Sequence, residues 1–285
     1  MLKRRSLLAG SLGALALSSK GAEAQSEQKF RHAVMAWCYQ PMKPVNLARA
    51  ALKVGVRGIE GLPQAAYPAV MAAGMKISMV SGAHSFKEGP CNPEFIDKVR
   101  AGLLHGIELA KQVGSKKLIT FPGMRFPGMD DEEAVKRCVA LWKEVVPAAE
   151  KAGITLVLEH LSSRDDSAPM KGHPGCFGDD VDFCFDLVRR VGSPNFKLLF
   201  DIYHVSVMNG DLIRRIRDHH ELIGHYHTAG NPGRGELDDK QEIQFAPVIA
   251  AIEATGYDGW LAHEFIPTWD DPIAALSHAV KVCGG

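Results

Sequence analysis

Apolar residues follow two different spacings along most of this chain. From His32 onward, short β-rich apolar runs alternate with longer segments in which apolar residues recur every three to four positions, as at Val99, Leu103 and Ile107. The longer segments have the spacing of amphipathic helices. The short runs predict eight strands, at 32–39, 57–62, 76–84, 116–123, 155–161, 196–204, 225–230 and 259–265.

Two kinds of residue mark the ends of the predicted helices. Glycine adopts the left-handed conformation that ends a helix at low cost, and glycines of this kind lie one to three residues before a strand. They are Gly55, Gly74, Gly114, Gly153, Gly224 and Gly256. Acidic residues at 130–133 and 179–180 place negative charge where the dipole of a helix N-terminus favours it.

Eight strands that alternate with helices predict a parallel sheet with right-handed crossovers. Such units close into a (β/α)8 TIM barrel, an α/β fold, and we expect one such domain over residues 25–285. An open doubly wound sheet is the alternative architecture. It usually carries a glycine-rich turn after its first strand, and no G-x-G-x-x-G pattern follows residues 32–39.

The N-terminal residues form a different kind of segment. Three basic residues at 3–5 precede an apolar run at 7–17, and Ala-Glu-Ala at 22–24 offers a cleavage site. The run is too short for a membrane span of about 20 residues. We therefore expect residues 1–24 to be a signal peptide that directs the protein to the periplasm or the medium. The Arg-Arg-Ser-Leu-Leu sequence favours the twin-arginine route, and a Sec signal or an uncleaved anchor is the alternative.

Composition and charge exclude several classes of protein. The chain has 285 residues, of which 46% are hydrophobic and 23% charged, so it is neither disordered nor collagen-like. Its net charge is 0, and loss of residues 1–24 removes four basic residues and one acidic residue, which leaves −3. A protein of this charge lacks the basic surface that binding to nucleic acid requires, and no stable membrane insertion is expected after cleavage. The oligomeric state stays open, a homo-oligomer included.

The six cysteines contain no C-x-x-C pair, and several lie in apolar runs. They are predicted to be buried free thiols. Cys176 and Cys184 are close enough in sequence to form a disulfide in an oxidising compartment, which is the alternative.

Polar residues stand at the ends of the last four predicted strands, where a barrel places its active site. They are Glu159, Asp201, His227 and Glu264. Adjacent strands lie about 4.8 Å apart, so inward-pointing side chains from these ends would converge. Any one of them alone would more often be a salt-bridged or hydrogen-bonded core group. Three converging carboxylates need a cation, and with one imidazole they suit Mn²⁺ first, with Mg²⁺, Co²⁺ or Zn²⁺ as alternatives.

Several motifs surround these residues. They are Gly55-Val-Arg-Gly-Ile-Glu60, Leu158-Glu159, Asp201-Ile-Tyr-His204, the run 224–236, and Gly256-Tyr-Asp-Gly-Trp260 with Glu264. The set resembles the xylose-isomerase-like TIM-barrel superfamily, and most closely its hydroxypyruvate isomerase and ketose 3-epimerase branches. The resemblance covers nearly the whole mature chain.

The resemblance implies that the four strand-end residues bind one divalent metal and that the two glutamates, Glu159 and Glu264, act as acid and base. It also implies that His204 and Arg234 hold the substrate. His227 is the ligand type of the epimerase branch, because hydroxypyruvate isomerase relatives tend to carry Gln there.

The implied reaction is proton transfer on a small carbonyl sugar or hydroxy-keto acid. The metal would stabilise charge on the carbonyl oxygen while a neighbouring carbon loses its proton, giving an enediolate. One glutamate would remove the proton and the other would return it, to the other carbon in an isomerase or to the opposite face in an epimerase. Glu60 and His84, at the ends of the second and third strands, are further candidates for substrate contact, and His225 is expected to fill a layer of the barrel.

Three rival functions remain open. The first is a lyase on the same metal site, in which the same proton removal is followed by loss of a leaving group. Such an enzyme would be a dehydratase or a keto-glycoside eliminase. A non-catalytic sugar-binding protein would have lost the metal site. A DNA-repair enzyme of the endonuclease IV type shares the fold, but export and an acidic balance disfavour it.

Overall fold

The computed structural model describes residues 30–82 and 84–285, so the predicted signal peptide lies outside the described residues. All strand pairs in it are parallel, and the strands follow the order β3-β2-β1-β9-β8-β7-β6-β5-β4. The strands are β1 (Arg31–Met35), β2 (Gly58–Glu60), β3 (Lys76–Ile77), β4 (Val80–Ser81), β5 (Lys117–Thr120), β6 (Thr155–Glu159), β7 (Phe196–Asp201), β8 (Ile223–Thr228) and β9 (Trp260–His263).

The sheet is a nearly closed barrel. Its two outermost strands, β3 and β4, are successive parts of the third predicted strand, and they pair with β2 and β5 respectively. Ser78 lies between them, and its N–H still donates to the Ile59 carbonyl at 3.2 Å. The prediction of a TIM barrel is therefore confirmed, with its third strand divided in two. An open doubly wound sheet is excluded for the described residues.

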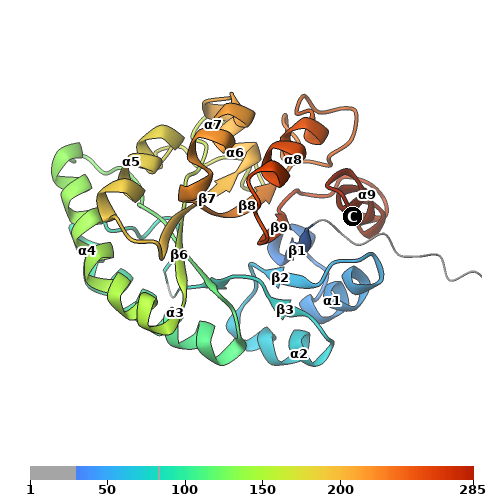
Figure 1. Ribbon diagram of the computed structural model, residues 1–285, viewed down its shortest axis with the longest axis horizontal. Coiled ribbons are helices and arrows are strands. Elements are labelled where there is room, and N and C mark those ends of the chain that lie inside the picture. Colours follow the sequence, from blue (N-terminus) through green and yellow to red (C-terminus); the bar gives the residue numbers. More distant parts are fainter. Residues whose placement is uncertain (1–29, 83) are drawn as a thin grey trace, which may run out of the picture.

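Helices surround the strands on the outside (Figure 1). The α-helices of the described residues are α1 (Pro44–Lys53), α2 (Tyr67–Ala72), α3 (Ile96–Val113), α4 (Asp131–Ala152), α5 (Val181–Val191), α6 (Ile202–Met208), α7 (Leu212–His219), α8 (Phe245–Ala254) and α9 (Pro272–Val282). Four short 3-10 helices add to them: η1 (Ala36–Tyr39), η2 (Gln64–Ala66), η3 (Pro93–Phe95) and η4 (His220–Leu222). Because η1 follows β1 directly, the first strand ends four residues before its predicted end.

The predicted helix ends are confirmed with one exception. The Asp130 and Asp180 side chains accept hydrogen bonds from backbone N–H groups in the first turns of α4 and α5, and α4 ends at Gly153 with a φ of 65°. Gly224 was wrongly expected to end a helix. It lies inside β8, where a Cβ atom would come within 2.9 Å of the Lys197 Cβ on β7, so its role is to permit close strand packing.

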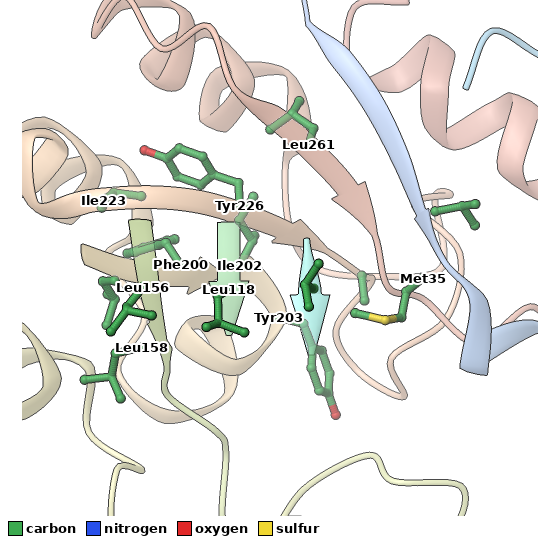
Figure 2. Close-up of a cluster of buried hydrophobic side chains, with 14 of the residues drawn as sticks. Met35, Leu118, Leu156, Leu158, Phe200, Ile202, Tyr203, Ile223, Tyr226 and Leu261 are labelled. Atoms are coloured by element: carbon green, nitrogen blue, oxygen red, sulfur yellow. The ribbon is translucent and has the colours of Figure 1, made fainter. Parts of the chain in front are cut away.

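The described residues contain two hydrophobic clusters. The larger one packs the outer faces of the strands against the helices, as in the contact between the Trp142 ring of α4 and the Phe196 ring of β7, whose centroids lie 4.9 Å apart. Figure 2 shows Leu156, Phe200 and Tyr226 of this cluster on neighbouring strands. The smaller cluster consists of Met79, Ile119, Val157 and Leu199 and lies on the opposite, inner face of the sheet.

The inner face positions the functional site. Side chains alternate between the two faces of a strand, so Glu159 faces the same way as Val157, and Asp201 the same way as Leu199. The inner cluster therefore lies directly below the carboxylates at the strand ends.

All six cysteines are buried free thiols, as predicted, and Cys176 and Cys184 are not bridged. Among the described residues, every helix is too short or too polar to cross a bilayer.

Candidate metal and substrate site

The four strand-end residues converge as the sequence predicted. Each offers one ligand atom to a common volume, and these atoms lie within 4.8 Å of one another. Glu159 ends β6, Asp201 ends β7, His227 lies in β8 and Glu264 follows β9. All four side chains are buried. Four consecutive units of a parallel barrel thus deliver three carboxylates and one imidazole to a single point.

The His227 ring lies between two sets of carboxylates. Its Nδ1 atom lies 2.6 Å from Glu264 Oε2 and 3.3 Å from Glu159 Oε1. Its Nε2 atom lies 2.7 Å from Oε1 of Glu60, on β2. Glu60 also accepts a hydrogen bond from Ser78 Oγ at 2.5 Å and lies 3.2 Å from His225 Nε2. Burial by itself raises the pKa of Glu60, but the two imidazoles lower it to about 2.

The two glutamates have different surroundings. Glu264 Oε1 accepts a hydrogen bond from Trp37 Nε1 at 3.0 Å, and Glu264 Oε2 lies 3.0 Å from Arg234 Nη2. Although burial opposes ionisation, Arg234 and His227 hold the pKa of Glu264 far below its ordinary value. Glu159 has no such donors, and burial together with the charge of Glu264 raises its pKa to about 7.

The site has unused oxygen atoms that fit a cation. Both Glu159 Oε1 and Asp201 Oδ2 are buried, and no group of the described residues forms a hydrogen bond with them. Such an arrangement costs free energy unless a further group satisfies these oxygens. The other Asp201 oxygen accepts from the N–H groups of Tyr203 and His204, which fixes the carboxylate in place. Burial and the neighbouring Glu264 raise the pKa of Asp201 to about 6. A hard divalent ion suits this oxygen-rich donor set.

A cavity of about 230 Å³ opens onto Glu159 and Glu264. It is smaller than the pockets of 300 Å³ and more that typically hold drug-sized ligands, so it fits a small substrate. Its other lining residues are Met35, Trp37, Gly61, Met79, Ser81, His84, Ser85, Phe86, Ile119, Phe121, Leu161, Met170, His173 and Arg234.

The predicted substrate residues divide into two groups. His84 and Arg234 line the cavity, as expected. Glu60 and His204 are fully buried and lie outside its lining, where Glu60 contacts His227 and His204 Nδ1 lies 2.9 Å from Ser162 Oγ. His225 faces the barrel interior beside Glu60, as expected for a residue that fills a layer. Trp37, which was not among the predicted residues, also lines the cavity.

Arg234 connects the carboxylates to the rim of the cavity. It belongs to the loop 229–236, has a φ of 56° and is 2% exposed. Its Nη1 atom donates to the Met170 carbonyl at 2.5 Å, and its guanidinium lies 5.2 Å from the centre of the Trp37 ring. The loop is anchored, because Glu236 accepts hydrogen bonds from the backbone N–H of Thr268 and Trp269.

Sequence reasoning missed the contribution of the long segment between β6 and α5. This segment supplies Leu161, Met170 and His173 to the cavity. Its length was the available signal, since long loops after the strands of a barrel usually carry function.

Comparison with known proteins identifies the family of the fold. A sequence profile of the xylose isomerase-like TIM barrel matches residues 48–282. The chain belongs to this family. Within the xylose isomerase-like family, its curated relatives include the hydroxypyruvate isomerase of Escherichia coli, 28% identical over 64% of this chain and 70% of that protein. Another is a 2-oxo-tetronate isomerase of Cupriavidus necator, 28% identical over 59% of this chain and 62% of that protein. The alignment thus spans about three fifths of the second relative.

Solved structures of the same fold are also similar. A family 2 AP endonuclease from Brucella melitensis superposes with a TM-score of 0.74, at 20% identity over 88% of this chain and 97% of that one. A 3-keto-D-glucoside 4-epimerase from E. coli superposes with a TM-score of 0.71, at 18% identity over 90% of this chain and 98% of that one. At these identities the structures establish the fold alone.

Proposed function

We propose that this protein is a divalent-metal-dependent isomerase or epimerase that moves a proton on a small keto compound through an enediolate. The convergence of Glu159, Asp201, His227 and Glu264 beside a small cavity carries the proposal. The isomerase names of the curated relatives support it. Mn²⁺ is the ion we expect first, because the site combines three carboxylates with a single imidazole.

The residues of the chain would divide the work as follows. Glu159, Asp201, His227 and Glu264 would hold the metal, which when bound supplies positive charge to offset negative charge on a substrate oxygen. Glu159 and Glu264 come from β6 and from the residue after β9, which are not neighbouring strands, so they approach the cavity from different sides. One of them would remove the proton from carbon and the other would return it.

The surrounding residues prepare the two glutamates for these roles. The Trp37 indole and the Arg234 guanidinium fix the orientation of Glu264, whereas Glu159 keeps an oxygen without a hydrogen-bond partner. In the metal-free site, burial and the charge of Glu264 raise the pKa of Glu159, whereas Arg234 and His227 lower that of Glu264, so Glu159 has the higher proton affinity of the two and is the better suited to take up a proton. The loop of Arg234 and the segment of Met170 would shield the reacting carbons from water.

Proton NMR in D₂O with the Mn²⁺-loaded protein tests the proposal. A panel of ketoses and keto acids should include compounds that gain deuterium on the carbon next to the carbonyl. Glu159→Gln and Glu264→Gln should each lower this exchange at least about 100-fold, while elemental analysis still finds the metal. Glu132→Gln, an exposed position at the start of α4, is the matched control and should leave exchange unchanged.

Other outcomes would identify the rival functions. Full exchange in both glutamine variants would remove the two-glutamate scheme. An unsaturated product in place of an isomer would establish a lyase. Tight sugar binding without metal and without exchange would establish a binding protein.

We also propose that residues 1–24 direct export by the twin-arginine route, which would let folding and metal loading finish before export. Fusion of residues 1–30 to a periplasmic reporter tests this. Replacement of Arg4 and Arg5 by lysine should abolish export of the reporter, and unchanged export would assign the segment to another route.

A further inference from the structure

The cavity is poor in positive charge. Among the described residues that line it, Arg234 is the single lysine or arginine. Its guanidinium is already engaged, since Nη2 lies 3.0 Å from Glu264 Oε2 and 3.7 Å from Asp201 Oδ2, and Nη1 donates to the Met170 carbonyl. Arg234 therefore compensates the charge of the protein's own carboxylates, and its one donor without a partner among the described residues is the buried Nε atom.

The other polar groups of the wall do not supply a second cation. Burial lowers the pKa of His84 and lowers that of His173 to about 4, so both rings are neutral at pH 7 and serve as hydrogen-bonding groups. Ser81 and Ser85 are uncharged. The nearby Lys87 is exposed, and its Nζ lies 5.9 Å from the centre of the Phe86 ring without lining the cavity.

One side of the cavity is apolar. Met79 and Ile119 belong to the inner hydrophobic cluster of the barrel, and Phe121 packs against that cluster. Phe86 and Leu161 are further apolar residues of the cavity lining. A carboxylate or phosphate placed against this wall would lose its hydration without gaining a partner, which is unfavourable. Carbon-bound hydrogens and uncharged hydroxyl groups would meet no such penalty.

The site has no excess positive charge for an acidic substrate. The three carboxylates that would hold the metal are offset by a divalent ion and the Arg234 guanidinium, and His227 is a neutral ligand in such a set. The Glu60 carboxylate beside His227 adds one further negative charge. We propose that the substrate is an uncharged hydroxy-ketone of the sugar type, and that keto acids such as those in the names of the curated relatives are poor substrates. This inference rests on the proposed function and narrows it to one substrate class.

Two matched pairs of compounds test the inference on the Mn²⁺-loaded protein. Dihydroxyacetone and hydroxypyruvate form a three-carbon pair, and erythrulose and 2-oxo-tetronate form a four-carbon pair. In each pair the first compound is uncharged and the second carries a carboxylate. Deuterium uptake should give a kcat/KM at least about 10-fold higher for the uncharged member, which corresponds to about 1.4 kcal/mol. Calorimetry with the unreactive pair erythritol and erythronate should show that the uncharged erythritol binds more tightly than the acid erythronate.

The result separates the inference from the function on which it rests. Equal or better exchange of the acids would overturn the inference and leave the isomerase intact. Absence of exchange in these four compounds and in the wider panel of ketoses and keto acids would overturn both. Lys87→Ala is the control, and its readout is the ratio of kcat/KM for the uncharged compound to kcat/KM for the acid. A change of more than about threefold in this ratio would show that Lys87 is a counter-ion for the acids and would overturn the inference. An unchanged ratio supports it.

Discussion

Oε1 of Glu60 lies 2.7 Å from Nε2 of His227, while the opposite ring nitrogen of His227, Nδ1, lies 2.6 Å from Glu264. A carboxylate on Nε2 favours the tautomer with its proton there and leaves the Nδ1 lone pair directed at the three carboxylates. Glu60 is itself fixed by Ser78 and His225. Glu60 therefore determines how His227 is presented, without lining the cavity.

The first prediction follows from this contact. Glu60→Gln removes the charge that raises the basicity of the His227 ring, so the protein should bind Mn²⁺ about 10-fold more weakly. Calorimetric titration of the metal-free protein measures the dissociation constant directly. The surface variant Glu132→Gln should titrate like the parent protein. Unchanged affinity in Glu60→Gln would show that the ring is oriented by other contacts.

The second prediction concerns pH and metal binding. Burial and neighbouring charge raise the pKa of Glu159 to about 7 and that of Asp201 to about 6, and a carboxyl group must lose its proton before it binds a metal. Binding should therefore release protons below pH 7, and the apparent affinity for Mn²⁺ should fall as the pH decreases from 8 to 6. Titrations in two buffers with different ionisation enthalpies count the protons. Equal affinity at pH 6 and pH 8 would contradict the raised pKa values.

The third prediction concerns the segment that carries Met170. Tyr203 Oη donates to the Lys171 carbonyl at 2.8 Å. Tyr203→Phe removes this bond and keeps the ring, so amide hydrogens at 165–172 should exchange about fivefold faster, which corresponds to about 1 kcal/mol. Among the described residues, Tyr39 Oη has no hydrogen-bond partner, so Tyr39→Phe is a matched control with no expected change. Equal exchange in the two variants would show that the bond does not hold the segment.

The fourth prediction concerns stability in acid. The buried rings of His32 and His263 are stacked 5.2 Å apart, with His32 Nδ1 lying 3.1 Å from His263 Nε2. Burial lowers the pKa of His32 to about 4, so the folded state binds fewer protons than the unfolded state between pH 4 and pH 6.5. The stability that depends on the neutral ring is present above pH 6.5. It is lost as the pH falls toward 4, by up to about 3 kcal/mol.

His32→Asn tests this prediction, because the amide can still bond to His263 but does not titrate. Urea unfolding at pH 7 and at pH 4.5 should show a smaller loss of unfolding free energy in the variant than in the parent protein. An identical loss in both would mean that His32 does not contribute to acid sensitivity.

Much of the fold could be predicted because its signals are local. The alternation of strand and helix spacings, the aspartates before α4 and α5, and glycines such as Gly153 each depend on a few neighbouring residues. Gly224 was misread for the same reason. Its position before a strand run is the same as that of a helix-ending glycine, and only its approach to Lys197 on another strand reveals its role.

The sequence by itself determined that Glu159, Asp201, His227 and Glu264 stand at equivalent strand ends, because each unit of a barrel repeats the same register relative to the axis. The tertiary structure alone decided that Glu60 contacts His227, that Trp37 donates to Glu264, and that the segment of Met170 and His173 closes the cavity. Those contacts join residues more than 100 positions apart or lie in irregular loops. They depend on how side chains and loops pack in three dimensions, and the spacing of apolar and polar residues along the chain does not predict that packing.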